Sequence, residues 1–210
     1  MKEHRIKALL FDCDGTLADT IMAHEKAYQK VFKQNSLAFD KNLYYRMFSC
    51  GSLSMLKDMT GDKYDTKVLR ELIKQKNTII TEYLDRYMVP NFMLVQKIKE
   101  SFYGHFNLGV VSNSSKISVS HIIERLGCRN VFDVILTKED VVYLKPHPEI
   151  YLRASRLLKV KPPECRVFED SLVGIEAASK AEMKTVKINI KKCNKKHRAC
   201  NDQILMMNIN

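Results

Sequence analysis

The sequence predicts an α/β protein in which a parallel sheet carries helices on both faces and an all-helical segment is inserted near the N-terminus. Two observations predict this fold class. Strand-like and helix-like segments alternate from about residue 90 to about residue 190, which is typical of a parallel sheet wrapped by helices. An apolar strand near the N-terminus is followed by an unbroken helical pattern from Thr20 to about Met88.

The first strand is expected at residues 5–12, where "RIKALLFD" forms a short apolar run that Asp and Gly end. The helical pattern then begins with "IMAHEKAYQKVF", whose apolar residues share one face, and continues through "VLRELIKQKNTIITEYL". Since the first strand belongs to the same sheet as the later ones, we expect two domains. Residues 1–19 and 89–210 form the core, and residues 20–88 form the helical insert.

The remaining elements alternate regularly along the second part of the chain. Strands are short apolar runs bounded by polar or turn residues, and helices carry apolar residues at helical spacing. The expected strands are 106–112, 131–136, 165–170 and 183–190, and the expected helices are 92–102, 115–126, 149–160 and 171–181.

Composition narrows the function classes. The 210-residue chain has a formal net charge of +11, which fits an anionic metabolite, an anionic surface, nucleic acid or an undirected bias. No nucleic-acid motif accompanies the charge, so nucleic acid is the disfavoured partner. Six scattered cysteines without a CxxC pair indicate a reducing compartment, and the absence of a long apolar run argues against a membrane partner. We expect a cytoplasmic protein, with a monomer favoured.

Polar and charged residues follow several expected strands, at the edge where parallel strands end. Functional groups gather at this carboxyl edge in α/β sheets. Crowded carboxylates need an explanation there, because like charges repel at short range. The residues are Asp12 and Asp14 after the first strand, Ser112 and Asn113 after the second, Lys145 in the loop after the third, and Glu169 and Asp170 at the end of the fourth.

These residue types suit a phosphate ester as substrate. One carboxylate can attack phosphorus and form an aspartyl-phosphate, while a second can protonate the leaving oxygen and then activate water. Clustered carboxylates favour a hard cation with oxygen ligands, which we expect to be Mg²⁺. Lys145 adds a positive charge on the phosphoryl oxygens, and Ser112 adds a hydrogen bond.

Four segments resemble, in order and spacing, the four motifs of the haloacid dehalogenase-like superfamily. They are "DCDGTL", "VVSNSS", "KPHPEIY" and "VFEDSLVGIEAA". The resemblance runs from residue 5 to about residue 190 and implies a Rossmann-like catalytic core. The helical insert resembles the cap of the branch that contains phosphoglycolate phosphatases, sugar-phosphate phosphatases and β-phosphoglucomutases.

The resemblance implies a role for each matching acid. Asp12 is expected to be the nucleophile and a metal ligand. Asp14 is expected to be the general acid/base and to bind the metal through its backbone carbonyl. Asp170 is expected to bind Mg²⁺, with Glu169 near the metal or its waters.

The resemblance also implies residues that hold the substrate. Ser112 and Lys145 are expected to bind the phosphate, with Asn113 beside them as a further contact. In the insert, His24 and Arg46 are candidates for substrate contact, although surface exposure of His24 is equally open. Other polar residues near Arg46 are also candidates, namely Ser49, Ser52 and Lys57.

We therefore expect a Mg²⁺-dependent phosphatase for a small phosphorylated metabolite, a sugar or polyol phosphate. A sugar-phosphate mutase of the β-phosphoglucomutase type is the alternative. Such mutases carry an arginine shortly after the glycine that Gly51 matches, and here residues 53–55 are Leu, Ser and Met. A non-enzymatic basic binding protein on the same fold is a third possibility, with the cluster 191–198 of the basic segment 191–200 as its contact.

Overall fold

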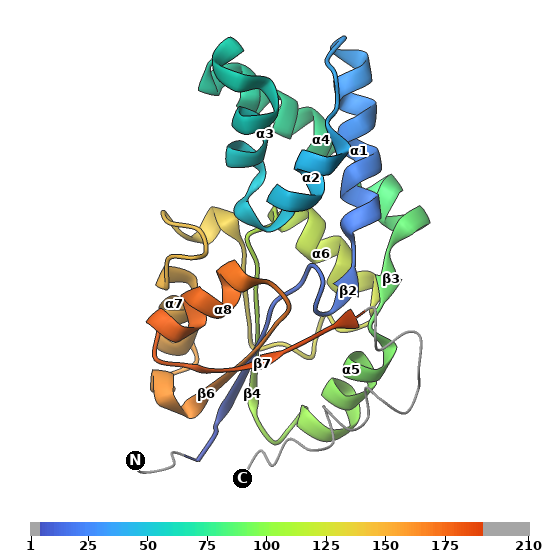
Figure 1. The fold of residues 1–210 in the computed structure, drawn as a ribbon. Coiled ribbons are helices and arrows are strands. Elements are labelled where there is room, and N and C mark those ends of the chain that lie inside the picture. Colours follow the sequence, from blue (N-terminus) through green and yellow to red (C-terminus); the bar gives the residue numbers. More distant parts are fainter. Residues whose placement is uncertain (1–4, 191–210) are drawn as a thin grey trace. The chain divides into compact units, whose positions relative to one another are not determined.

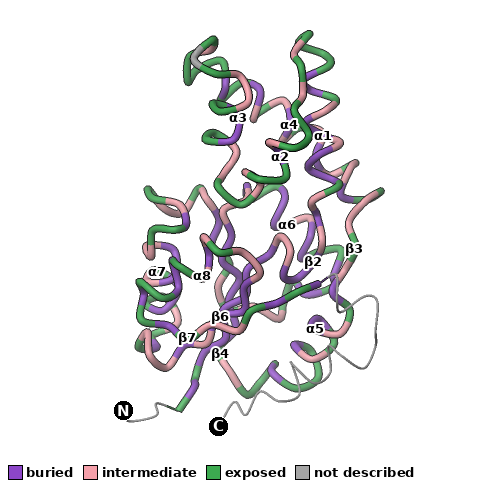
Figure 2. Tube along the Cα trace, in the orientation of Figure 1, coloured by how far each residue is buried: buried purple, intermediate pink, exposed green. Residues whose placement is uncertain are grey.

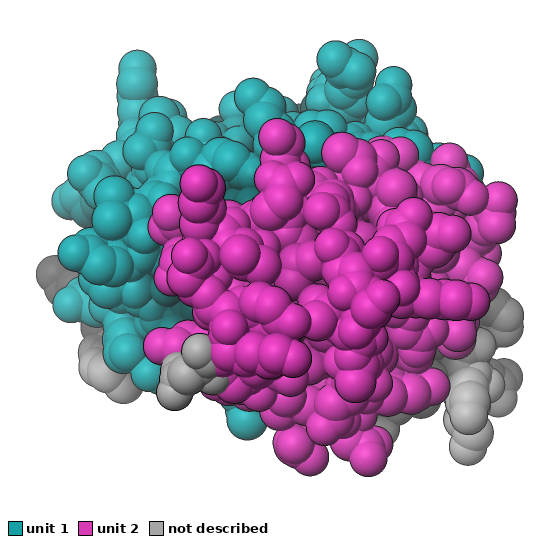
Figure 3. All heavy atoms as spheres, turned by 90° about the horizontal axis from the view of Figure 1, so that it is seen from above, with its two compact units in different colours: residues 1–19, 89–210 teal, residues 20–88 magenta. Residues whose placement is uncertain are grey.

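The computed structural model describes residues 5–190 of the chain. The basic segment 191–200 lies outside the described residues. Contacts divide the chain into two compact units, Met1–Asp19 with Val89–Asn210 and Thr20–Met88. Figure 3 colours the two units separately. Among the described residues, none of the helices combines the length and apolar character needed to cross a membrane.

Unit 1 is built on a parallel sheet, as the sequence predicts. Neighbouring strands pair in the order β5-β4-β1-β6-β7, and every pair is parallel. The first strand lies at the centre because it is the most apolar, with all four residues buried (Figure 2). The strands are β1 (Ala8–Phe11), β4 (Asn107–Val111), β5 (Val134–Leu136), β6 (Cys165–Glu169) and β7 (Lys184–Lys187).

Helices cover both faces of this sheet (Figure 1). Alternation along β1 sends Ala8 and Leu10 to one face, where they join a core with Tyr151 and Ala177. Phe11 points to the other face, where its ring stacks on that of Phe102 at a centroid distance of 6.4 Å. Helices α7 (Glu149–Leu157) and α8 (Leu172–Lys180) cover the first face, and α5 (Phe92–Lys97) and α6 (Lys116–Arg125) the second.

Some element ends differ from the sequence prediction. The helix expected over 92–102 changes to a π-helical turn at Ile98–Phe102. The helix expected over 149–160 ends at Leu157, because Lys159 adopts a positive φ of 56° that stops it. Short 3₁₀ turns, which carry no periodicity of their own, lie at Lys138–Asp140 and Pro162–Glu164.

A two-stranded antiparallel pair was not expected. Strand β2 (Ala18–Asp19) pairs with β3 (Val89–Pro90), so the chain leaves and re-enters unit 1 at neighbouring positions. Asn91 fixes this junction, because its backbone N–H donates to Leu17 O and its side chain donates to Thr16 O. Two-residue strands are too short for hydrophobic alternation to indicate them.

Unit 2 is helical throughout its described part, in agreement with the sequence pattern. Aspartates cap two helices, since Asp40 accepts from Leu43 N–H and Asp65 accepts from Val68 N–H. Aromatic and aliphatic side chains of all four α-helices form its own buried core. The elements are α1 (Ile21–Gln34), α2 (Lys41–Met47), α3 (Ser52–Thr60) and α4 (Thr66–Tyr87), with 3₁₀ turns at Phe48–Cys50 and Gly61–Lys63.

Candidate active site

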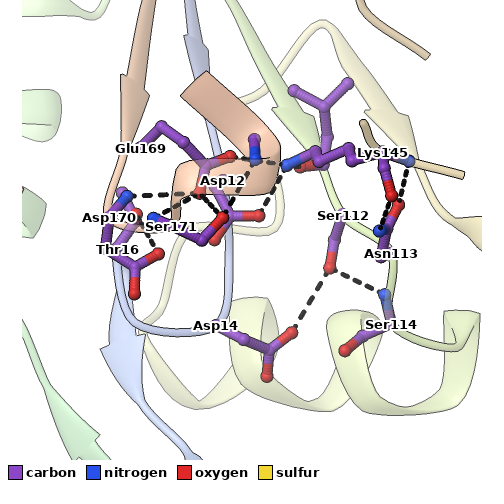
Figure 4. A network of polar contacts seen from close by, with 12 residues as sticks. Asp12, Asp14, Thr16, Ser112, Asn113, Ser114, Lys145, Glu169, Asp170 and Ser171 are labelled. Carbon is purple, nitrogen blue, oxygen red and sulfur yellow. Dashed lines mark hydrogen bonds and ion pairs between the residues drawn. The ribbon is translucent and has the colours of Figure 1, made fainter. Parts of the chain in front are cut away.

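The register of the sheet brings the ends of three strands together. Phe11, the last residue of β1, pairs with Val110 of β4 and with Phe168 of β6. Asp12 follows directly, and its N–H donates to Phe168 O at 2.9 Å. The side chains that follow β1, β4 and β6 therefore lie at one edge of unit 1, as Figure 4 shows.

A buried lysine lies between two of the acids. Lys145 Nζ lies 2.7 Å from Asp12 Oδ1 and 2.8 Å from Glu169 Oε2. Its remaining hydrogen bond goes to Val111 O at 3.0 Å. All three charged residues are buried, so these charge-assisted bonds operate with little screening by water.

Glu169 accepts hydrogen bonds through both carboxylate oxygens. Oε2 accepts from Lys145 Nζ and from the Tyr151 hydroxyl, each at 2.8 Å. Oε1 accepts from Asp170 N–H and from the N–H and hydroxyl of Ser171. With five donors in place, the Glu169 carboxylate is held firmly and in turn holds Lys145. Because its oxygens already accept these bonds, Glu169 fits a position near a metal or its waters better than direct ligation of the metal.

The acids shift one another's pKa values. Burial, with Glu169 close by, raises the pKa of Asp12 well above its usual range. Burial would also raise the pKa of Glu169, but the charge of Lys145 outweighs it and holds the value below the usual range. Burial alone would lower the pKa of Lys145, but Asp12 and Glu169 raise it, so the lysine stays charged.

Asp170 lies beside the turn that follows Asp12. Burial and the neighbouring Glu169 raise the pKa of Asp170 to about 7. The Thr16 hydroxyl donates to Asp170 Oδ1 at 3.5 Å, which joins this turn to the end of β6. Gly15 has a φ of 92°, and a Cβ there would collide with the Asp170 carboxylate, so only glycine allows this approach.

The segment after β4 brings a hydroxyl to the second acid of the first motif. Ser112 Oγ donates to Asp14 Oδ2 at 3.3 Å and accepts from Ser114 N–H at 3.0 Å. Ser115 caps α6 immediately afterwards by accepting from Ser118 N–H.

Asn113 makes contacts that differ from the expected phosphate contact. Its Oδ1 accepts from Lys145 N–H at 3.0 Å, and its Nδ2 donates to Lys145 O at 3.2 Å. Both ends of the amide are therefore bound to the backbone of the lysine. Asn113 thus joins the β4 end to the loop that carries Lys145, and its contact with phosphate stays a prediction.

Three acids lie close enough together for a cation to be held among them. One carboxylate oxygen from each of Asp12, Glu169 and Asp170 lies within 4.8 Å of the others. The donors are all oxygen, which suits a hard ion such as Mg²⁺. Burial, and then the nearby charge of Glu169, raises the pKa of both Asp12 and Asp170, and a bound cation would favour their charged forms. The residues present therefore fit the expected metal.

The two candidates in unit 2 have different environments within that unit. His24, on α1, is buried, and its ring meets that of Phe48 at a centroid distance of 5.6 Å. The surface exposure considered for His24 is therefore wrong. Arg46 lies exposed in the last turn of α2. Substrate contact by either residue stays a prediction.

Two residues of the network were missed by sequence reasoning. Tyr151 lies on α7, six residues after Lys145, within a segment that reads as an ordinary amphipathic helix. Ser171 is the N-cap of α8 and also donates to Glu169. The only available signal for Tyr151 was its place inside the third motif, because helical spacing alone marks it as core.

The parallel sheet with an acidic site at its carboxyl edge places the chain among α/β enzymes. It belongs to the haloacid dehalogenase-like hydrolase family, whose model matches residues 9–188. Fold class and family thus confirm what the four motifs indicated.

Individual relatives span nearly the same length. The chain is 27% identical to fructose-1-phosphate phosphatase YqaB of Escherichia coli, over 89% of this chain and 98% of the relative. It is 27% identical to β-phosphoglucomutase of Bacillus subtilis, over 85% of this chain and 81% of the relative. The crystal structure of CbbY from Rhodobacter sphaeroides in complex with phosphate matches with a TM-score of 0.78 and 26% identity, covering 86% of this chain and 84% of that one.

Proposed function

We propose that the protein is a Mg²⁺-dependent phosphatase that hydrolyses a small phosphorylated metabolite, a sugar or polyol phosphate, through an aspartyl-phosphate. The coarser class, a phosphoric monoester hydrolase, follows from family membership together with relatives named as phosphatases. The observation that carries the finer proposal is the contact between Lys145 Nζ and Asp12 Oδ1 beside Asp170. It sets a buried cation against the carboxylate that would attack phosphorus.

Each residue has a task in this reaction. Asp12 attacks phosphorus, and the P–O bond to the leaving group breaks as the new P–O bond forms. Asp14 gives its proton to the leaving oxygen and later takes one from the water that cleaves the aspartyl-phosphate. Lys145 and Ser112 bind phosphoryl oxygens as their charge develops. The side chains of Asp12 and Asp170, with the backbone carbonyl of Asp14, would hold the ion.

When bound, Mg²⁺ supplies positive charge that cancels the repulsion between an anionic nucleophile and an anionic substrate. Glu169 acts at one remove, by fixing Lys145 and by lying close to the ion. A cytoplasmic location and a monomeric state remain predictions.

The test measures phosphate released from a panel of sugar, polyol and small carboxylate phosphates, with Mg²⁺ and with chelator. We expect Mg²⁺-dependent release from at least one ester. Asp12→Asn should lower turnover by on the order of 10³-fold or more, as expected for a lost covalent nucleophile. Glu176→Gln is the matched control, because Glu176 lies exposed on α8 and pairs only with Lys180 among the contacts described. Near wild-type turnover by Asp12→Asn would refute the role of Asp12.

A mutase is the second candidate, because a β-phosphoglucomutase is among the relatives. Leu53, Ser54 and Met55 stand where the mutases of this branch carry an arginine, which favours hydrolysis. A sugar 1-phosphate incubated with the protein distinguishes the two reactions. Formation of the 6-phosphate isomer in place of free phosphate would establish the mutase.

A further inference from the structure

The ammonium of Lys145 already uses its full donor capacity. An ammonium group has three N–H bonds. Here they go to Asp12 Oδ1, Glu169 Oε2 and Val111 O, at 2.7, 2.8 and 3.0 Å. If Lys145 binds a phosphoryl oxygen, as the proposed function requires, one of these three bonds has to be exchanged for it.

The bond to Asp12 is the one suited to exchange. Val111 O is a backbone carbonyl at the end of β4, so the sheet holds it in place. The carboxylate of Glu169 is held independently through Oε1 by Asp170 and Ser171. Asp12 is the carboxylate that a phosphoryl group would approach, so a phosphoryl oxygen arriving there could take over its N–H.

Tyr151 contacts both Glu169 and Lys145. Its side chain is fully buried, and its hydroxyl donates to Glu169 Oε2 at 2.8 Å, the same oxygen that accepts from Lys145. Its ring centroid lies 5.0 Å from Lys145 Nζ, within range of a cation–π interaction. The hydroxyl therefore takes up part of the negative charge that would otherwise draw the ammonium toward Glu169.

We propose that Tyr151 is a positioning residue for Lys145, which by sharing Glu169 Oε2 keeps the ammonium divided between Glu169 and Asp12 and leaves one N–H ready to pass to a phosphoryl oxygen. This inference rests on the proposed function. Tyr151 itself does not touch the substrate and acts through Glu169 and Lys145.

The first test is kinetic and uses Tyr151→Phe, which removes the hydroxyl and keeps the ring. We expect kcat to fall about tenfold, equal to about 1.4 kcal/mol, with KM changed less than about twofold. The reason is that Ser112 still holds ground-state phosphate, whereas Lys145 matters most as charge develops. Tyr151→Leu, which also removes the ring, should show a larger fall in kcat. An unchanged kcat in Tyr151→Phe contradicts the proposal.

A matched control separates positioning from a general disturbance of α7. Ser155 is also buried on α7, and its hydroxyl bonds only to Leu152 O among the contacts described. Ser155→Ala should leave kcat and KM at wild-type values. A kcat loss in Ser155→Ala equal to that in Tyr151→Phe would assign the effect to the helix and overturn the specific role.

The second test does not depend on activity. A crystal structure of Tyr151→Phe should show Lys145 Nζ still bonded to Glu169 but beyond about 3.5 Å from Asp12 Oδ1. If Nζ keeps all three acceptors at unchanged distances, the positioning role is wrong. If wild type releases phosphate from no ester with Mg²⁺, the proposed function fails by itself, while the position of Nζ still decides the role of Tyr151.

Discussion

The ammonium of Lys145 lies 2.7 Å from the Oδ1 atom of Asp12, although 133 residues separate the two in the chain. Both side chains are buried, and Glu169 lies on the other side of the lysine at 2.8 Å. The Lys145 ammonium in this position couples the stability of unit 1 to the charges at its site. Measurements of folding as well as of turnover can therefore test the site.

Removal of the Lys145 charge should destabilise the metal-free protein strongly. Lys145→Met leaves Asp12 and Glu169 buried without their common partner, and breaking a buried pair in this way costs about 3–5 kcal/mol of unfolding free energy. Lys180→Met is the control, because Lys180 pairs with Glu176 at the exposed surface of α8. In urea unfolding with chelator at pH 7, the control should lose less than about 1 kcal/mol of unfolding free energy. Equal losses would contradict burial of the ion pair.

Substitution of Gly15 should lower the free energy of unfolding by more than the strain of its positive φ alone explains. Gly15→Ala suffers both a positive φ of 92° and a collision with the Asp170 carboxylate. Gly104 provides the comparison, because its φ is 80° and a Cβ there meets no atom within 4 Å. Gly104→Ala should lose about 1–2 kcal/mol of unfolding free energy. Gly15→Ala should lose more and also bind Mg²⁺ more weakly by calorimetry, and a result no worse than Gly104→Ala would argue against the close approach of Asp170.

The metal-free protein should lose stability as the pH rises from about 4 to about 7 through the titration of Asp170. Its pKa is raised to about 7 in the folded protein from the usual 3.8, so the folded state binds this proton more tightly than the unfolded state. The stabilising contribution is thus complete below the unfolded value and lost as pH rises through the folded one. Asp170→Asn should flatten this part of the profile in urea unfolding with chelator. A wild-type profile that rises over the same range, and is unchanged in Asp170→Asn, would contradict the shift.

Addition of Mg²⁺ should reverse that loss above pH 7. An ion that binds only the folded state adds about 2.7 kcal/mol to the unfolding free energy at one hundred times its dissociation constant. The increase should shrink at pH 5, because protons compete for Asp170. Asp170→Asn, measured in parallel by thermal unfolding, should respond little to Mg²⁺. A similar response in the variant would place the ion elsewhere.

The residues that follow strands were predictable from sequence, because parallel strands end at one edge whatever their exact length. The structure brings Asp12, Ser112 and Asp170 to that edge although the ends of several elements shift by a few residues. Asp14 lies with them, since it is fixed by the turn that follows β1. Short motifs therefore located the site without accurate element ends.

Contacts that depend on packing between distant elements were not predictable. The hydroxyl of Tyr151 reaches Glu169 only because α7 packs on the sheet, and nothing in its helical spacing distinguishes it from other core residues. Asn113 was expected to face substrate, whereas its amide binds the backbone of Lys145. These contacts depend on the path of a loop 32 residues away, which the sequence pattern does not reveal, and contact of Asn113 with substrate stays a prediction.

The pairing of Ala18 with Pro90 and of Asp19 with Val89 brings together the two points between which residues 20–88 are inserted. The entropic cost of closing a loop between two adjacent points rises by only about 0.6 kcal/mol for each doubling of the loop length. The stability of the sheet therefore depends little on the length of the segment inserted there. Evolution could thus exchange one insert for another, or shorten it to a simple turn, while keeping the chemistry intact. New substrate specificities could arise by recombination at the β2–β3 junction, without substitution of the residues at the carboxyl edge of the sheet.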